Sequence, residues 1–562
     1  MGKHSSKKSA QIISSALQQA GINQVVISPG SRNAPLIIEL TNRPAFSNYS
    51  VIDERVAGFF ALGMAQQIKK PVVLVCTSGS ALLNYYPAVA EAFYSKIPLV
   101  VISADRPQKW VDQGEGQTIR QHEVFKNHSW YNTTLSENED EKAIHENISA
   151  VNLALQTAIE KQGPVHINVP FDEPLYELVD TEDISVPSIQ PDTEPQIYEE
   201  TFLDTFARQW NQSRRKMILV GQHAPSEFLQ LQLEKFIQDP SVIVLHENIS
   251  NVHHVDFIGQ IDQAIFSLSD DQLAELAPEI LITVGRNIVS KKVKQFLRKY
   301  KPKAHWHVEQ TSLPPDTFKA LTQHFDTTPE MFFSQFLFLA QANQSSDFQK
   351  KWHTIKQRHA QNHQKFIANA PYSDLKVFDT IIRAIPDDYM IHWGNSSTIR
   401  YAQLFDYKPA QVHFGNRGTS GIDGSTSTAI GAAFAGQLPA LMISGDISFL
   451  YDSNALWNKY IPNNFKLIVI NNGGGDIFNF IPGPSRTQAL NEFFVTKHNL
   501  NTQKQAEMFG FKYYQVQNLA DLEAYLPNFF SQNNQPQLLE IVTREVDNAG
   551  VLKAYFKTIF SV

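Results

Sequence analysis

Short apolar runs alternate with helical stretches through the first 180 residues of the chain. The runs are nearly continuous in branched aliphatic residues, which is typical of strands buried on both faces of a parallel sheet. Helical patterns, for example over residues 55–69, lie between them. The alternation predicts a doubly wound α/β domain, with strands at residues 24–28, 49–53, 71–76, 98–103 and 165–169.

The same alternation returns twice further along the chain. The second block has predicted strands at residues 217–220, 242–245, 280–284 and 305–308. The third block has predicted strands at residues 389–393, 411–414, 440–444, 467–471 and 538–542. A stretch rich in Pro, Asp, Glu and Thr separates the first two blocks, and a polar helical stretch separates the last two. We predict three doubly wound α/β domains at residues 1–180, 200–342 and 371–562, with linkers at 181–199 and 343–370.

The composition fits a chain with several packed cores. Of its 562 residues 42% are hydrophobic, and 48 Lys and Arg against 56 Asp and Glu give a net charge of -8. The single cysteine excludes an intrachain disulfide and a cysteine-based metal site. The negative charge argues against non-specific nucleic-acid binding, and no apolar run is long enough for a membrane span. We therefore expect a cytoplasmic protein.

Polar, glycine-containing turns follow many of the predicted strands. In an open parallel sheet, ligands bind beyond the carboxyl ends of the strands, close to helix N-termini that favour anions. These turns are therefore the places where a functional site is expected. They read SPGSRNAPL (28–36), DER (53–55), SADRP (103–107), GNSS (394–397) and NRGTSGIDGS (416–425).

One further pair of turns carries oxygen ligands. Asp446 follows one predicted strand, and Asn472, 26 positions later, ends the next. One helix and one strand fit between them, so the two turns meet if the strands are parallel neighbours. A carboxylate, a carboxamide oxygen and a backbone carbonyl form a hard site that suits Mg²⁺ and phosphate oxygens. Either turn alone is more simply ordinary turn chemistry, but the pair at this spacing favours the metal site.

This Gly-Asp and Asn-Asn pair resembles the diphosphate–Mg²⁺ motif of thiamine-diphosphate enzymes, although Ile447 stands where that motif usually has Gly. Residues 77–107 resemble the pyrimidine-domain segment of the same superfamily. The turns SPGSRNAPL, SADRP, GNSS and NRGTSGIDG are together similar to the 2-succinyl-5-enolpyruvyl-6-hydroxy-3-cyclohexene-1-carboxylate synthase (MenD) family. The resemblance covers the first and third predicted domains and, more weakly, the second. It implies a pyrimidine-binding first domain, a central α/β domain and a diphosphate-binding third domain.

The resemblance implies a thiamine diphosphate site with Glu54 as the catalytic residue. In the superfamily this carboxyl hydrogen-bonds the aminopyrimidine ring and favours the tautomer that removes the C2 proton of the cofactor. The plainer interpretation of Glu54 is a helix-starting residue that interacts with the helix dipole. The implied ligands of Mg²⁺, for which Mn²⁺ is a substitute, are Asp446, Asn472 and the carbonyl of Gly474. These three also count as cofactor-binding residues, together with Glu54, Ser396 and the apolar wedge Ile422.

The family's substrates, 2-oxoglutarate and isochorismate, carry several carboxylates, and arginine is the side chain best suited to pair with them. Taken singly, each arginine in the strand-end turns is more simply a surface residue, but four matching motifs imply a substrate site. Lys291 and Lys292 stand where the family has Lys-Arg, so bidentate pairing is lost at the second position; a solvated helix start is the competing interpretation. The implied substrate-binding residues are Arg32, Arg106, Gln117, Lys291, Lys292, Asn395, Ser396, Arg400, Arg417, Ile477, Phe478 and Ile481.

The implied reaction is the decarboxylation of 2-oxoglutarate and the 1,4-addition of the resulting succinyl carbanion to isochorismate, a transferase step of menaquinone biosynthesis. The family also implies a homodimer or homotetramer with active sites at the subunit interface. Two alternatives stay open. One is another thiamine-diphosphate carboligase, such as an acetolactate-synthase-like enzyme, although the density of arginines argues against a small, uncharged acceptor. The other is a non-catalytic nucleotide-binding module on the same scaffold.

Overall fold

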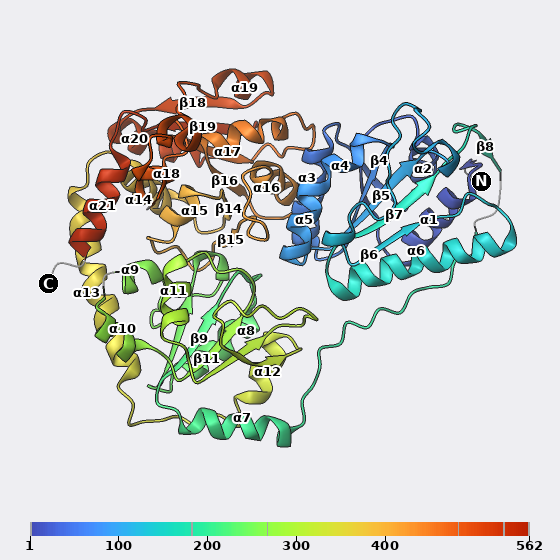
Figure 1. The fold of residues 1–562 in the computed structure, drawn as a ribbon. Helices are drawn as coiled ribbons and strands as arrows, with labels where there is room; N and C mark the ends of the chain where they lie inside the picture. The colour runs from blue at the N-terminus through green and yellow to red at the C-terminus, as the bar shows by residue number, and fades with distance from the viewer. Residues whose placement is uncertain (1–2, 181–183, 267, 482, 532–533, 560–562) are drawn as a thin grey trace.

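The computed structural model contains three α/β lobes, each built on a parallel sheet (Figure 1). It describes residues 3–180, 184–266, 268–481, 483–531 and 534–559. The N-terminal lobe, in blue and cyan, lies beside the C-terminal lobe, in orange and red, and the central lobe, in green and yellow, lies below them in this view. The predicted fold class is confirmed.

The N-terminal domain has six parallel strands in the order β3-β2-β4-β5-β7-β6. Its inner strands are apolar and buried because helices cover both faces of the sheet. The strands are β2 (Gln24–Ile27), β3 (Ser47–Ser50), β4 (Val72–Cys76), β5 (Leu99–Asp105), β6 (Tyr131–Thr134) and β7 (Val165–Pro170). The main helices are α1 (Lys8–Gln19), α2 (Ala34–Thr41), α3 (Glu54–Ile68), α4 (Ser80–Asn84), α5 (Tyr86–Ser95) and α6 (Glu141–Lys161).

One strand of this domain lies elsewhere than the sequence predicts. The strand expected at residues 49–53 is wrong in position, because β3 ends at Ser50 and the side chain of Asp53 already caps α3 by accepting the N–H of Val56 at 3.2 Å. β3 is a polar edge strand, so no apolar run marks it. A short antiparallel pair, β1 (His4–Ser5) with β8 (Leu178–Val179), joins the two ends of the domain.

The central domain has five parallel strands in the order β10-β9-β11-β12-β13. The strands are β9 (Lys216–Val220), β10 (Val242–His246), β11 (Ile280–Val284), β12 (Ala304–Val308) and β13 (Leu321–Phe325). Its helices include α7 (Glu200–Gln212), α8 (Glu227–Phe236), α9 (Ile261–Ile265), α10 (Asp270–Leu276), α11 (Lys291–Lys299) and α12 (Pro329–Phe336). Two apolar clusters, one on each face, hold the helices to the sheet.

The C-terminal domain has six parallel strands in the order β15-β14-β16-β17-β19-β18. They are β14 (Met390–Trp393), β15 (Val412–Phe414), β16 (Ala440–Gly445), β17 (Lys466–Asn471), β18 (Lys512–Val516) and β19 (Gln537–Val542). Because β16 and β17 are neighbours, the turns that follow them meet at one edge of the sheet. The helices include α14 (Asp374–Ala384), α15 (Ser397–Ala402), α16 (Ser425–Ala435), α17 (Asp446–Tyr451), α18 (Ile477–Phe480), α19 (Gln503–Met508), α20 (Leu519–Phe529) and α21 (Asn548–Ile559).

Two connections join the domains. Residues 184–199 form no helix or strand and run from the N-terminal lobe down to α7, while residues 181–183 lie outside the described part of the chain (Figure 1). The second connection contains the long helix α13 (Phe348–Asn369), which passes along α9 and α21. The predicted polar stretch before Pro371 is therefore a packed helix that spans the central and C-terminal domains.

The N-terminal and C-terminal domains share a hydrophobic core in which α3 packs on α16. The two helices cross at glycines. A Cβ atom on Gly63 would lie 2.0 Å from the carbonyl oxygen of Thr428, and one on Gly431 would lie 2.0 Å from that of Phe60. No larger residue fits at this crossing without moving the backbone. The close approach fixes the positions of the segments that carry Glu54 and Ile422.

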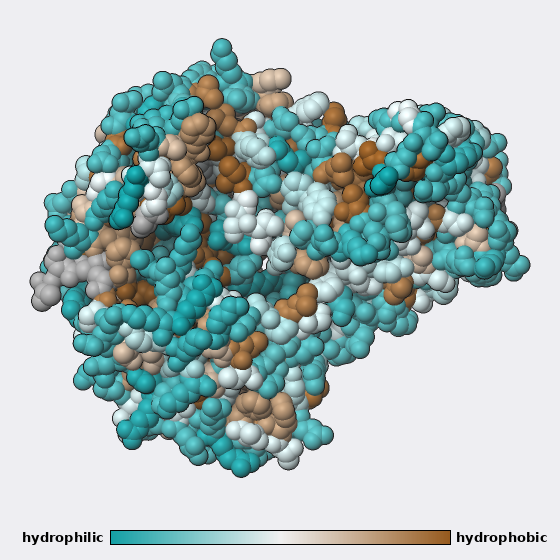
Figure 2. Space-filling model, viewed as in Figure 1, coloured by the Kyte–Doolittle hydropathy of each residue, from teal (hydrophilic) through white to brown (hydrophobic). Residues whose placement is uncertain are grey.

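The face of the molecule in Figure 2 is mostly hydrophilic, with scattered apolar patches. One patch lies over the N-terminal domain near the C-terminal domain. Exposed apolar side chains include Ile52, two positions before Glu54, and also Leu83 and Trp457. Within the described ranges, no helix has the length and apolar character needed to cross a membrane.

Candidate active site

The turns after β16 and β17 are joined by the carboxylate of Asp446. Its Oδ2 accepts the N–H groups of Gly473 and Gly474 at 2.8 and 3.0 Å, and its Oδ1 accepts the N–H of Ile447 at 2.7 Å. The Nε2 of His498 lies 3.3 Å from Oδ2. Asp446 is 2% exposed, and these donors compensate its buried charge.

Asn472 presents an acceptor with no partner among the described residues. Its Nδ2 donates to Oδ2 of Asp374 at 2.8 Å, whereas its Oδ1 is buried and makes no hydrogen bond within the described chain. Burial raises the pKa of Asp374 to about 7, and the hydrogen bonds from Thr543 and Asn472 oppose that rise. A buried, unpaired oxygen costs free energy unless a ligand completes it. The arrangement therefore leaves the Asn472 carboxamide oxygen available to a cation.

Two glycines leave room beside this oxygen. Gly473 and Gly474 have φ angles of 79° and 147°, which favour glycine. A Cβ atom on Gly474 would lie 2.4 Å from the carbonyl oxygen of Val495. The chain therefore presents bare backbone after β17, and bare backbone allows close approach of a phosphate group.

Glu54 is the first residue of α3 and is half-buried. Burial raises its pKa, its own backbone N–H opposes the rise, and the charge of Asp53 adds to it. The charge of Glu54 also contributes to the raised pKa values of buried Cys76 and Tyr85. A carboxyl with a raised pKa is suited to sharing a proton with a nearby nitrogen.

The side chain of buried Gln121 forms hydrogen bonds to the segments near Arg106 and Gln117. Its Oε1 accepts the N–H of Gly79 at 2.8 Å, and its Nε2 donates to the carbonyl of Ala104 at 3.1 Å. Gln117 is exposed and has a φ angle of 55°. Its backbone lies close to Gly79, because a Cβ atom on Gly79 would lie 3.1 Å from the Cα of Gln117. Gln121 is not among the residues predicted for the site, although it lies in the same segment as Gln117, GQTIRQ (116–121).

The two predicted arginines of the N-terminal domain are bound to their own domain. Arg32 is buried, donates to the carbonyl of Phe171 at 3.0 Å and lies 3.4 Å from the carboxylate of Glu173. Arg106 donates from Nε to the carbonyl of Gly116 at 3.0 Å. Both guanidinium groups keep further N–H donors that an anion can use.

The predicted polar residues of the C-terminal domain form one connected group. The buried amide of Asn395 donates to the carbonyl of Asn416 at 2.8 Å and accepts a hydrogen bond from Nη1 of Arg417. Arg400 donates to the carbonyl of Ser396, whose φ angle of 70° is rare for a residue with a side chain. The Nε of Arg417 is buried and has no partner among the described residues. Two arginines thus converge on the turns after β14 and β15.

The predicted apolar residues lie on both sides of these turns. Ile422 is half-buried, and its carbonyl accepts a hydrogen bond from the hydroxyl of Ser448 at 3.1 Å. Ile477 is buried at the start of α18, whereas Phe478 and Ile481 are partly exposed. The loop after β17 therefore has apolar side chains available to cover a bound ring.

Lys291 and Lys292 open α11 in the central domain. Lys291 is exposed, and Lys292 lies with its Nζ 4.2 Å from the centre of the Phe266 ring. The charges of Lys292 and Arg400 both act on the partly buried carboxylate of Asp262. The structure thus brings the start of α11 to the same side of the molecule as the arginines of the C-terminal domain.

The predicted residues fall into two groups. Asp446, Asn472, Gly474, Asn395, Ser396, Arg400 and Arg417 belong to the C-terminal domain, with the central-domain lysines beside them, whereas Arg32, Glu54, Arg106 and Gln117 belong to the N-terminal domain. Within the described ranges, no hydrogen bond or ion pair joins a residue of one group to a residue of the other. The two neighbours of Glu54 do contact the C-terminal domain, since Nδ2 of Asn454 donates to Oδ2 of Asp53 at 2.8 Å and Arg55 donates to the carbonyl of Tyr451 at 2.7 Å.

Three family models match successive parts of the chain. Residues 7–124 match the N-terminal TPP binding domain of thiamine pyrophosphate enzymes, residues 192–392 match the middle domain of thiamine pyrophosphate enzymes, and residues 394–541 match the C-terminal TPP binding domain. The chain is 49% identical to the 2-succinyl-5-enolpyruvyl-6-hydroxy-3-cyclohexene-1-carboxylate synthase of Flavobacterium psychrophilum, with 98% of each chain covered. It is 48% identical to the enzyme of the same name from Flavobacterium johnsoniae, with 98% of each covered, and 38% identical to that from Porphyromonas gingivalis, with 99% of this chain covered and 98% of the relative.

The chain belongs to the 2-succinyl-5-enolpyruvyl-6-hydroxy-3-cyclohexene-1-carboxylate synthase family. The resemblance inferred from the sequence is confirmed. As members of this family have thiamine-diphosphate-binding domains, the first and third domains are the ones that bind this cofactor. The residues of the C-terminal domain fit its diphosphate and a hard cation, because the candidate ligand atoms are all oxygen and the Asn472 oxygen has no partner among the described residues.

Glu91 supports the loop that carries Arg417, and it was not predicted from the sequence. Its buried carboxylate lies on α5 of the N-terminal domain and accepts the N–H groups of Gly418 and Thr419, both at 2.7 Å. It therefore fixes the loop that carries Arg417 to another domain. A single acidic residue within the otherwise apolar stretch around it was the signal available in the sequence.

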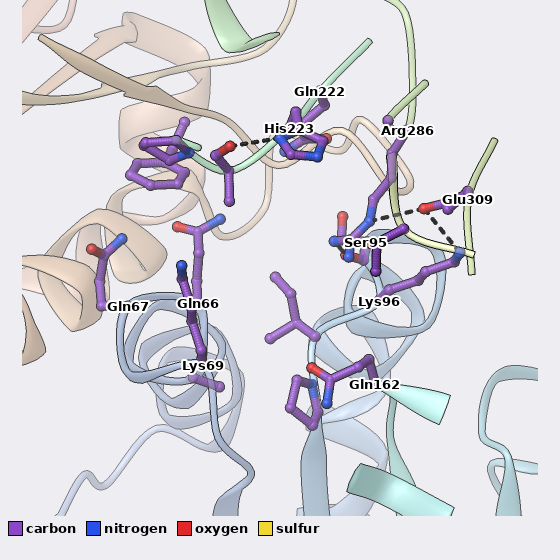
Figure 3. A pocket seen from close by; sticks show the side chains of 18 of the residues that line it. Gln66, Gln67, Lys69, Ser95, Lys96, Gln162, Gln222, His223, Arg286 and Glu309 are labelled. Carbon is purple, nitrogen blue, oxygen red and sulfur yellow. Dashed lines mark hydrogen bonds and ion pairs between the residues drawn. The ribbon is translucent and has the colours of Figure 1, made fainter. Parts of the chain in front are cut away.

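A cavity of about 550 Å³ lies where the three domains meet (Figure 3). Lys96 and Arg286 both approach the carboxylate of Glu309 there, at 2.9 and 3.5 Å. The described residues that line this cavity include none of the predicted site residues. Side chains labelled around it in Figure 3 are Gln66, Gln67, Lys69, Ser95, Lys96, Gln162, Gln222, His223, Arg286 and Glu309.

Proposed function

We propose that this chain is a 2-succinyl-5-enolpyruvyl-6-hydroxy-3-cyclohexene-1-carboxylate synthase of menaquinone biosynthesis. It combines 2-oxoglutarate with isochorismate and releases CO₂. The observation that carries the proposal is the 49% identity to a synthase of that name over 98% of the chain. The convergence of Arg400 and Arg417 on the ends of neighbouring strands supports it, because both substrates are anions.

The cofactor residues of the proposal follow from their places in the fold. Thiamine diphosphate, when bound, supplies the acyl-anion chemistry that neither substrate nor protein provides. Asp446, Asn472 and the carbonyl of Gly474 would hold Mg²⁺, or Mn²⁺ in its place, against the diphosphate. Ile422 would give the cofactor an apolar support. Glu54 would hold a proton on its carboxyl and share it with the pyrimidine ring, a role that its raised pKa supports.

The substrate residues of the proposal surround these positions. Arg400 and Arg417 would hold carboxylates on the side of the C-terminal domain, with Asn395 and Ser396 as polar neighbours. Ile477, Phe478 and Ile481 would cover the ring of isochorismate and exclude water from it. The remaining proposed contacts are Arg32, Arg106 and Gln117 in the N-terminal domain and Lys291 and Lys292 in the central domain.

We propose that the active site is completed by a second subunit, in a homodimer or homotetramer. Within the described residues, the proposed site residues of the N-terminal domain make no hydrogen bond or ion pair with those of the C-terminal domain, which leaves room for a second subunit to contribute to the site. Exposed apolar side chains also support it, because such side chains are typical of protein–protein contacts. Ile52, two positions before Glu54, is 47% exposed, and Trp457 is 50% exposed.

Purified protein tests the proposal when 2-oxoglutarate, isochorismate, thiamine diphosphate and Mg²⁺ are supplied together and singly omitted. We expect isochorismate consumption and CO₂ release only when all four are present. Faster CO₂ release from pyruvate than from 2-oxoglutarate would favour an acetolactate-synthase-like enzyme instead. Absence of turnover with either oxoacid, while the cofactor still binds, would favour a non-catalytic module.

A further inference from the structure

Two acidic side chains of the central domain face the positive charges of the proposed substrate site. Glu247 follows β10 and is 1% exposed, and Asp262 lies on α9 and is partly buried. Their charges act on the arginines of the C-terminal domain through space, Glu247 on Arg417 and Asp262 on Arg400. Neither acid belongs to the strand-end turns from which the site was predicted.

Both acids hold the chain just before α11. The two carboxylate oxygens of Glu247 accept the N–H groups of Val289 and Ser290, each at 2.7 Å. The hydroxyl of Ser290 donates to Asp262 and accepts the N–H of Val293 at 3.0 Å, which caps α11. The first turn of the helix is thus fixed from two sides, and that turn carries the two lysines of the proposed site.

The same segment of the central domain is bound to the C-terminal domain. The hydroxyl of Tyr407 donates to the backbone carbonyl of Glu247 at 3.0 Å, and Nε2 of Gln403 donates to Oδ1 of Asn248 at 3.0 Å. These contacts follow directly on α15, which carries Arg400. Hydrogen bonds therefore join the segment that holds the start of α11 to the residues just after Arg400, across the boundary between the two domains.

A nearby negative charge stabilises the buried guanidinium of Arg417 in its charged form. Burial lowers the pKa of Arg417, the carboxylate of Glu247 opposes this effect, and the like charge of Arg400 adds to it. The unpaired, buried Nε of Arg417 is a donor that no described residue satisfies. An ionised Glu247 therefore favours a charged guanidinium that still has a free donor for an incoming anion.

We infer that Glu247 and Asp262 are positioning residues, which hold the cations of the substrate site in place for an anion without touching it. This inference rests on the proposed function, which supplies the anionic substrates. A purely structural role would need only the hydrogen bonds to the start of α11. The added charge effect on Arg400 and Arg417 distinguishes the two roles, because it makes substrate affinity depend on the ionisation of the acids.

The ionisation of Glu247 falls within the range of ordinary assays. Burial raises its pKa to about 7, and the N–H groups of Val289 and Ser290 oppose the rise. Above this pH the carboxylate accepts both N–H groups, whereas below it a proton occupies one acceptor position. KM for an anionic substrate should therefore rise as the pH falls from about 8 to about 6. The charged and titratable groups that face Glu247 are Asp262 on α9, Lys294 on α11, and Tyr407 and Arg417 of the C-terminal domain.

The variant Glu247→Gln tests the inference, and Asp239→Asn is its matched control. Asp239 is a buried acid of the same domain, paired with Lys216 at 2.7 Å. We expect Glu247→Gln to raise KM for 2-oxoglutarate, isochorismate or both by about tenfold, with a smaller change in kcat. The rise in KM at low pH should also disappear in this variant. Asp239→Asn should lower the melting temperature but leave KM and its pH dependence unchanged.

Amide hydrogen exchange at Val289 and Ser290 gives a readout that does not need turnover. Protection of these two N–H groups should fall in Glu247→Gln and, in the parent chain, as the pH falls below about 7. Unchanged protection, or changed protection with unchanged KM for both substrates, would overturn the inference. If the parent chain shows no turnover with the two substrates, the proposed function fails instead, and exchange alone still decides whether Glu247 holds the start of α11.

Discussion

At the scale of single residues, burial and the neighbouring Asp53 disfavour the charge of the predicted catalytic carboxyl, Glu54. Burial raises the pKa of Glu54, and Asp53 adds a second negative charge beside it. A raised pKa is typical of a carboxyl that takes part in chemistry rather than in stability. Function and stability should therefore respond differently when its charge is removed.

We predict that Glu54→Gln lowers turnover by about 100-fold or more without lowering the melting temperature, because glutamine removes a charge that burial disfavours. Steady-state assays and calorimetry on the same sample measure the two effects. Glu141→Gln is the matched control, since Glu141 also opens a helix directly after a capping aspartate, Asp140, and is exposed. Full turnover in Glu54→Gln would exclude the proposed proton-sharing role.

A second residue-scale prediction concerns the orientation of Asn472. Asp374 accepts the hydrogen bond from its Nδ2, and the carboxamide oxygen has no donor among the described residues. Asp374→Asn should weaken Mg²⁺ binding by about 10-fold to 100-fold, as loss of a ligand's supporting hydrogen bond commonly does. Titration of Mg²⁺ against activity and by calorimetry checks this. Asp379→Asn, on the same helix but paired with Arg383, should leave the affinity for Mg²⁺ unchanged.

At the scale of elements, the crossing of α3 and α16 is the tightest contact between the N-terminal and C-terminal domains. Gly63→Ala places a Cβ atom against the backbone of Thr428, where no side chain can move aside. We predict a loss of about 1–3 kcal/mol in the free energy of unfolding, the usual cost of overpacking. Gly116→Ala is the control, because a Cβ atom there meets open space. Equal denaturant midpoints for the two variants would contradict the close crossing.

The burial of each strand determines whether it could be predicted from the sequence. Inner strands such as β4 and β11 are buried on both faces, so an unbroken apolar run marks each of them. The strands β6, β13 and β18 lie at sheet edges and alternate or lack apolar residues, and no strand was predicted there. Polar edge strands are stabilised by pairing with a neighbour, which a local pattern does not reveal.

At the scale of the whole molecule, sequence motifs predicted individual turns, but they did not predict the side chains that fix these turns in place. The spacing of Asp446 and Asn472 predicted that their turns meet if the two strands are parallel neighbours, and β16 and β17 are parallel neighbours. By contrast, Glu91 and Glu247 act on loops more than 40 positions away in the sequence. Contacts between segments far apart in the sequence leave no periodic or local signal, because each partner is a single polar residue in an unrelated segment.

Glu309 holds the central domain to the N-terminal domain, and its removal tests how much that contact contributes. Its carboxylate lies 2.9 Å from Nζ of Lys96 and 3.5 Å from Nε of Arg286 (Figure 3). Burial alone would raise its pKa, but the hydrogen bond with His307 and the charges of Lys96 and Arg286 lower it to about 2. Glu309→Gln leaves two cations without their shared partner, so we predict a loss of about 2–4 kcal/mol near neutral pH.

The pH dependence of that loss has a defined sign. A carboxyl with a pKa lower in the folded chain than in the unfolded chain stabilises the fold above its unfolded pKa, and this stabilisation is lost as the pH falls towards the folded value. The difference in melting temperature between parent and Glu309→Gln should therefore be largest near neutral pH and shrink as the pH falls below about 4.5. Calorimetry over this range measures it, with Asp172→Asn as the control because its pair with Lys109 is exposed. A difference that stays constant with pH would mean that Glu309 stabilises the domain contact by packing rather than by charge.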